Sequence, residues 1–202
     1  MFIQVFQGPV SDRQEARRGL DDWVERLAPG AEGWLGSTAG VTDDGTFIGI
    51  ARFASSAAAQ RNSGRALQGE WWSGMSKLFT GEVSFHDCSE VHAGRGGGSD
   101  SAGFVQVIQG RTTDLVRMRE TMTVFEERFP HLRPDLIGYL VAVHDGEDGA
   151  FTQAAYFTSE DEARAAEAQQ PAEAAEVPAE EMDLMRDLRY LDLHEPWLHS
   201  PR

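Results

Sequence analysis

The stretch Phe2-Ile3-Gln4-Val5-Phe6-Gln7-Gly8 occurs twice in this chain. It reappears as Phe104-Val105-Gln106-Val107-Ile108-Gln109-Gly110, at an offset of 102 residues and with five of the seven residues identical. Such self-similarity at a fixed offset indicates two copies of one structural unit, and it has to be recognised before single elements are assigned. The chain is therefore predicted to be a tandem duplication.

The similarity runs through the whole of each copy. Phe47–Phe53 matches Phe151–Phe157, and Val83–Asp87 aligns with Leu188–Asp192. Between the copies lies a glycine-rich segment, a composition typical of flexible linkers. We therefore predict a first repeat over residues 1–92, a linker over residues 93–102 and a second repeat over residues 103–202.

Each copy shows the order strand, helix, strand, strand, helix, strand. In the first copy, Ser11 and Gln14 have the spacing of a capping box at the start of a helix, and Leu20, Trp23 and Leu27 give that helix one apolar face. The order βαββαβ is the ferredoxin-like arrangement, in which helices cover one face of an antiparallel sheet. The predicted fold class is α+β.

The first strand of each copy is apolar on both of its faces. Phe2 and Phe6 alternate with Ile3 and Val5, whereas a sheet with one solvated face would alternate apolar with polar residues. The helices can cover only one face, so the other face needs a second cover. We predict two ferredoxin-like βαββαβ repeats packed sheet to sheet, as an intramolecular dimeric α+β barrel.

The composition of the chain limits the classes of partner that it is expected to bind. The net charge of −15 repels phosphate backbones and anionic lipid, so we expect neither nucleic acid nor membrane as a partner. Cys88 is the single cysteine and cannot form an internal disulfide or a thiolate metal cage. The opening residues lack the pattern of a signal peptide. We expect a cytoplasmic pseudo-dimer that binds a small molecule, with further association left open.

Several stretches resemble the dimeric α+β barrel superfamily, which includes antibiotic-biosynthesis-type monooxygenases, haem-degrading monooxygenases and muconolactone isomerases. They are the Phe-Ile-Gln-Val-Phe-Gln opening, the strand over Gly33–Thr38, the strand-into-helix junction over Phe47–Ser56, and Glu70-Trp71-Trp72 followed by Leu78-Phe79. The resemblance covers nearly the whole chain and implies a barrel with a small-molecule cavity. It does not specify a reaction, because the superfamily uses one barrel for many reactions.

The resemblance does not extend to a haem site or a metal site. The haem-degrading relatives use an asparagine on the first strand and an axial histidine on the second helix. Here the strands carry Gln4 and Gln106, and no histidine occurs over residues 62–85 or 159–189. His194 and His199 are five residues apart with Pro196 between them, which disfavours a helical zinc motif and favours a packed C-terminal tail. We expect no cofactor and no metal.

Five candidate site residues come from comparing the two copies. Gln4 and Gln106 are equivalent buried amides, which either satisfy each other or a nearby backbone group or orient a polar ligand. His86 corresponds to Leu191 and is either a structural histidine or the catalytic base. Arg52 corresponds to Tyr156; we interpret Arg52 as a rim ion-pair former or as a ligand anchor in the barrel, and Tyr156 as a residue that holds substrate oxygens.

The second helical region of the first copy supplies the remaining candidates. Trp71 and Trp72 are adjacent and would point about 100° apart on a helix, so both cannot face the same pocket. Either both serve core packing alone, or one is in the core and the other lines a cavity. Asn62 either presents its amide to the same space or is an exposed helical residue.

The favoured function is a cofactor-independent monooxygenase acting on an aromatic or polyketide-like substrate. In this hypothesis His86 removes a proton from a phenolic substrate, the resulting anion reacts with O₂, Trp71 or Trp72 shapes the pocket, and Gln4, Arg52 or Tyr156 holds the oxygens. The alternatives are a non-catalytic small-molecule-binding or stress-associated module, and an isomerase or lyase.

Overall fold

The computed structural model describes residues 1–98, 100–169 and 184–201, with the backbone alone over residues 124–132. The chain divides into two compact units. The first consists of Met1–Val91 together with Glu195–Arg202, and the second of His92–His194. The last residues of the chain thus belong to the same unit as the first.

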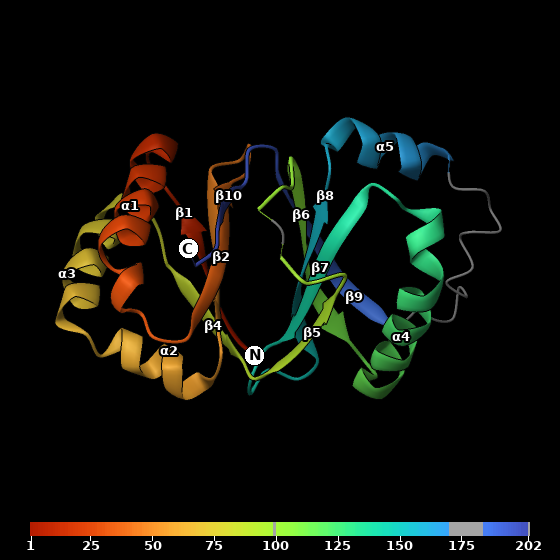
Figure 1. Ribbon diagram of the computed structural model, residues 1–202, viewed down its shortest axis with the longest axis horizontal. Coiled ribbons are helices and arrows are strands. Elements are labelled where there is room, and N and C mark those ends of the chain that lie inside the picture. Colours follow the sequence, from red (N-terminus) through yellow and green to blue (C-terminus); the bar gives the residue numbers. More distant parts are fainter. Residues whose placement is uncertain (99, 170–183, 202) are drawn as a thin grey trace. The chain divides into compact units, whose positions relative to one another are not determined.

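The first unit is a five-stranded antiparallel sheet covered on one face by helices α1, α2 and α3 (Figure 1). The sheet order is β10-β2-β3-β1-β4. Its strands are β1 (Phe2–Pro9), β2 (Trp34–Val41), β3 (Thr46–Phe53), β4 (Ser84–Cys88) and β10 (Trp197–His199). The helices are α1 (Arg13–Arg26), α2 (Ser56–Ser63) and α3 (Ala66–Met75), with short 3-10 turns at Ala28–Gly30 and Ser76–Leu78.

The second unit has the same plan. Its sheet order is β5-β7-β8-β6-β9, and α4 and α5 lie on one face of it. The strands are β5 (Glu90–Gly94), β6 (Phe104–Thr112), β7 (Leu136–Val143), β8 (Ala150–Phe157) and β9 (Met185–Leu193). The helices are α4 (Leu115–Leu132) and α5 (Glu160–Gln169). The predicted α+β class is confirmed.

Each sheet takes its fifth strand from the segment that follows the other repeat. Strand β5 follows β4 in the chain but pairs with β7, and β10 follows β9 but pairs with β2, with Trp197 opposite Ala39. The expected C-terminal tail is therefore a short edge strand. His194 and His199 belong to different units, where they contact Glu160 and Asp21 respectively.

The glycine-rich segment is packed, and the expectation of a flexible linker was wrong over its described part. A Cβ on Gly94 would lie 2.1 Å from the ring of Tyr139, and a Cβ on Gly138 would lie 2.0 Å from the carbonyl oxygen of Gly97. Arg95 also donates to the backbone oxygen of Leu136. Glycine is needed here because the backbone approaches β7 closely.

Helix α1 begins one residue later than its capping-box pattern suggested. The carboxylate of Asp12 accepts hydrogen bonds from the backbone N–H groups of Gln14 and Glu15, at 2.8 and 3.0 Å. Ser11 instead donates from its hydroxyl to the backbone oxygen of Leu78. Both residue types cap helices well, and the tertiary contact of Ser11 decides between them.

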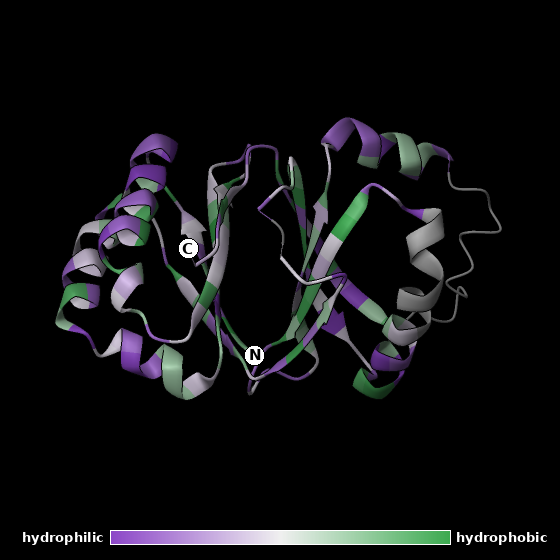
Figure 2. Ribbon diagram, viewed as in Figure 1, coloured by the Kyte–Doolittle hydropathy of each residue, from purple (hydrophilic) through white to green (hydrophobic). Residues whose placement is uncertain are grey.

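The helix-covered face of the first sheet holds most of the aromatic core. Phe2, Trp23 and Trp34 form one buried cluster, and Phe47 with Trp197 belongs to another. Figure 2 shows hydrophobic stretches along the strands, whereas α1 is mostly hydrophilic. Helix α1 therefore packs on the sheet through a narrow apolar stripe, and the sheet supplies most of the buried surface. No helix among the described residues is long and apolar enough to span a membrane.

Candidate functional site

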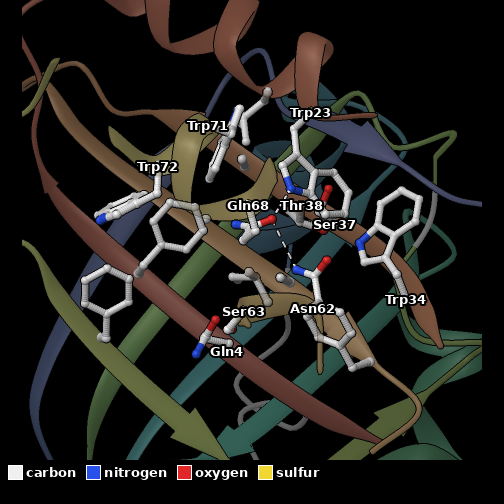
Figure 3. Close-up of a pocket in the computed structure, with 18 of the residues that line it drawn as sticks. Gln4, Trp23, Trp34, Ser37, Thr38, Asn62, Ser63, Gln68, Trp71 and Trp72 are labelled. Atoms are coloured by element: carbon white, nitrogen blue, oxygen red, sulfur yellow. Dashed lines mark hydrogen bonds between the residues drawn. The ribbon is translucent and has the colours of Figure 1, made fainter. Parts of the chain in front are cut away.

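A cavity of about 280 Å³ lies in the first unit, between the sheet and its helices (Figure 3). The strands contribute its floor, and α1, α2 and α3 contribute the opposite wall. The lining residues are Gln4, Phe6, Leu20, Trp23, Trp34, Ser37, Thr38, Ala39, Gly49, Ile50, Ala51, Phe53, Asn62, Ser63, Gln68, Gly69, Trp71, Trp72 and Phe85.

Small side chains on β2 and β3 leave the room for this cavity. Ser37 lies opposite Ala51, and Ala39 lies opposite Gly49. The same pairing in the second sheet brings together Tyr139 with Ala155 and Val141 with Gln153. Tyr139, Val141 and Ala155 are buried in the core of the second unit, whereas Ala51 is only half-buried. The two repeats have thus diverged at the floor of the cavity.

Aromatic rings form most of the cavity wall. Trp72 meets Phe6 and Phe85 edge to face, with ring centroids 6.0 and 5.3 Å apart. Trp71 donates its indole N–H to the backbone oxygen of Gly19 on α1, at 2.7 Å. Both tryptophans line the cavity, so the expectation that only one could do so was wrong: two long indoles reach one broad cavity despite the angle between them. Phe85 is 51% exposed.

A chain of hydrogen bonds fixes the amides on the helical side. Arg65 donates to Asn62 Oδ1 at 2.9 Å, and Asn62 Nδ2 donates to Gln68 Oε1 at 3.3 Å. Trp23 Nε1 donates to the same oxygen at 2.7 Å. Because arginine and the indole nitrogen are donors only, these bonds define which atom of each amide is oxygen. Asn62 is buried and not an exposed helical residue.

Gln4 occupies the sheet side of the cavity. Its Nε2 donates to Asp87 Oδ1 on β4 at 2.9 Å. Gln106 makes the equivalent bond to Asp192 Oδ1 at 3.0 Å in the second unit. Each glutamine is therefore bound by an aspartate of its own sheet, and not by the other glutamine as one interpretation had it. The shared arrangement explains the repetition of this amide without a ligand.

The second unit places a cation where the first has open space. Arg164 on α5 contacts the ring of Phe104, with its guanidinium carbon 5.1 Å from the centroid, and pairs with Asp192. Burial opposes the charge of Arg164, but Asp192 and Glu167 outweigh this effect, so the pKa of the guanidinium is raised. The residue equivalent to Arg164 in the first repeat is Gln60, which is exposed. The region around Gln106 is thus occupied by protein.

His86 and Arg52 do not lie with Gln4. His86 pairs with Val5 and Arg52 with Ile3, whereas Gln4 pairs with Asp87 and Ala51. Because successive residues of a strand point to opposite faces, His86 and Arg52 are on the face away from the cavity. Tyr156 likewise pairs with Val105 and lies on the opposite face to Gln106. The register thus separates the proposed base from the cavity.

Arg52 is a buried cation, 7% exposed, and its Nε has no hydrogen-bond partner among the described residues. Arg52→Met is expected to raise the free energy of unfolding by about 1 kcal/mol, because a buried N–H donor without a partner is replaced by an apolar chain of similar length. Urea unfolding measures this. Arg26→Met, which removes an exposed ion pair with Asp22, should change stability by less than about 0.5 kcal/mol. A destabilised Arg52→Met protein would contradict the prediction.

Haem does not fit this cavity. Haem iron in proteins takes an axial histidine, cysteine, methionine or tyrosine. None of these residue types is among the described residues that line the cavity. The lining residues also include no aspartate, glutamate, lysine or arginine. Asp87 and Arg65 lie behind the lining, each bonded to a lining amide.

Sequence reasoning identified Gln4, Asn62, Trp71 and Trp72 and missed the rest of the wall. Trp23 was assigned to the core alone, and Trp34 and Gln68 were not considered as site residues. A signal was available in the repeat itself, since Ser37 corresponds to Tyr139. A small residue in one copy against a large one in the other indicates a space that only one copy keeps open.

Comparison with solved structures finds the same fold over the whole chain. A protein of Fusobacterium nucleatum subsp. nucleatum ATCC 25586, described as a "putative monooxygenase", superposes with a TM-score of 0.77 at 8% identity, covering 98% of this chain and 94% of that one. A second so described, from Lactobacillus acidophilus NCFM, gives 0.72 at 13% identity, covering 98% and 99%. The chain shares the α+β fold of these two structures.

An anthrone oxidase-like protein also shares this fold, with a TM-score of 0.69 at 11% identity and coverage of 98% of this chain and 92% of that one. No protein-family model and no curated protein sequence matches the chain. At these identities the likeness establishes the fold alone. The chemistry has to be argued from the cavity.

Proposed function

We propose that the protein is a monooxygenase that oxidises a flat aromatic molecule with O₂ in the cavity of the first unit. The observation that carries the proposal is the shape and chemistry of that cavity. Its volume suits a molecule of two or three fused rings, and its walls include Trp23, Trp34, Trp71 and Trp72. Two of the similar structures are described as a "putative monooxygenase" and a third as anthrone oxidase-like, which favours the same class of reaction.

The substrate in this proposal supplies the electrons. In a ring CH₂ group of the anthrone type, the carbon gains one oxygen atom and becomes a carbonyl. The second oxygen atom leaves as water, which carries both hydrogens of the CH₂ group. Four electrons pass from substrate to O₂, so no further reductant is required. The protein binds the ring, orients it and excludes water around the reacting carbon.

Oxygen uptake with anthrone tests the proposal. We expect the protein to accelerate anthrone-dependent O₂ consumption at least about tenfold over buffer, with anthraquinone as the product. Protein inactivated irreversibly by boiling serves as the control for adventitious metal and surface effects. Uptake no faster than in buffer, under conditions where anthrone binds, would show that the cavity does not catalyse this reaction.

A second candidate is a non-catalytic binding module. It is favoured by one specific observation, the lack of ionisable side chains among the described lining residues, because proton removal from a substrate usually needs a base within reach. This alternative predicts that anthrone raises the melting temperature and is recovered unchanged. The two candidates are separated by analysing the bound compound after incubation in air.

A further inference from the structure

The cavity presents unpaired hydrogen-bond donors. Trp34 is 6% exposed and lines the cavity, and its Nε1 is buried without a hydrogen-bond partner among the described residues. Figure 3 shows this nitrogen on the edge of the indole that faces the middle of the cavity. An indole N–H can only donate, so the group needs an acceptor atom that the neighbouring residues do not supply.

Gln68 offers a second donor to the same cavity. Its Oε1 already accepts from Trp23 Nε1 and Asn62 Nδ2, so the amide cannot turn over without leaving both donors unsatisfied. The Nε2 group therefore points the other way, toward the side of Trp71 and Trp72 in Figure 3. The hydrogen bonds to Trp23 and Asn62 hold this orientation before any ligand arrives.

We propose that Trp34 Nε1 and Gln68 Nε2 are polar recognition groups of the cavity, and that its ligand is an aromatic ketone or phenolate with an oxygen that accepts from one of them. The inference rests on the proposed function for the location of the ligand and adds its chemical class. An apolar cavity with a few oriented donors selects strongly for an acceptor, since a ligand without one leaves buried donors unpaired. Trp34 and Gln68 act here as binding residues.

A matched pair of probes tests the inference without any turnover. 9-Fluorenone and fluorene have the same flat three-ring shape and differ in one carbonyl oxygen. Binding is measured by quenching of tryptophan fluorescence. We expect fluorenone to bind at least about tenfold more tightly than fluorene, the effect of one to two hydrogen bonds.

Two variants remove the donors by different routes. Trp34→Phe keeps a ring and deletes the N–H, and Gln68→Glu keeps the shape but replaces the donor by an acceptor oxygen. The variant that removes the donor bound to the carbonyl should weaken fluorenone binding about tenfold, and both variants should leave fluorene within about twofold. Gln60→Glu adds the same charge at an exposed position of α2 and should change neither. If one variant fails to fold, the other still tests the inference.

Two results would overturn the inference in different ways. Equal affinities for fluorenone and fluorene, unchanged in both variants, would mean that the cavity binds aromatic rings without recognising the carbonyl oxygen. The proposed function would still stand. Failure of the wild-type protein to bind either probe would remove the cavity as a ligand site and the proposed function with it.

Discussion

Replacing Trp197 by alanine is expected to lower the free energy of unfolding of the first unit by about 3–5 kcal/mol, as for other fully buried tryptophans. Trp197 is 4% exposed and packs on Phe47, with ring centroids 6.2 Å apart. It also belongs to the buried cluster that includes Leu20 and Ala39. The side chain therefore holds strand β10 on the edge of a sheet made mostly from the other end of the chain.

The unfolding of the first unit can be followed separately by tryptophan fluorescence, because of where the aromatic residues lie. All five tryptophans are in the first unit, and all three tyrosines are in the second. Urea unfolding followed by tryptophan emission in the remaining four therefore reports on the first unit. Leu198→Ala, at the next and half-buried position of β10, is the control and should cost about 1 kcal/mol. Equal losses for the two variants would mean that β10 is not anchored through Trp197.

Filling the cavity from its floor is expected to abolish ligand binding. Ala51 lies between Gln4 and Ser37 on the helix-covered face of the sheet and lines the cavity. The ring introduced by Ala51→Phe would occupy the space of an aromatic ligand. We expect the affinity for fluorenone to fall at least about a hundredfold, which corresponds to about 2.8 kcal/mol, with O₂ uptake lost in parallel. Fluorescence quenching and an oxygen electrode measure the two effects.

The second repeat supplies the matched control. Ala155 pairs with Gln106 as Ala51 pairs with Gln4, but it is 5% exposed and packed within the core of the second unit. Ala155→Phe should therefore destabilise the protein by about 1–3 kcal/mol through overpacking and leave ligand affinity unchanged. Ala51→Phe should be tolerated better because an open space receives its ring. Ligand binding that survives Ala51→Phe would place the site elsewhere.

Most of the fold could be predicted from the sequence because its signals are local or repeated. The strands over Trp34–Val41 and Thr46–Phe53 are apolar runs joined by a short turn, and the second repeat shows the same pattern again. Strands β5 and β10 escaped prediction because they are short and their partners are remote in the sequence. A strand of three residues such as Trp197–His199 has almost no periodicity of its own.

The candidate site was predicted only in part, for a similar reason. Gln4 was found because the other repeat carries the same amide, Trp71 because the other repeat has no tryptophan there, and Asn62 because it precedes Trp71 in the same helical region. His86 was chosen because the other repeat has Leu191 there, and that comparison carries no information about the direction of the side chain. Each face of β4 (Ser84–Cys88) carries both polar and apolar side chains, so the pattern of this strand could not distinguish the cavity side from the opposite side.

By itself the sequence determined that this protein is a duplicated α+β chain, because repetition and periodicity are properties of neighbouring residues. Strand register was decided only in three dimensions. It placed Val5 beside His86 and Gln4 beside Asp87, and so directed the histidine away from the cavity and the amide toward it. The cavity also depends on packing, because its walls join residues from α1, α2, α3 and four strands whose distances follow from the folded chain alone.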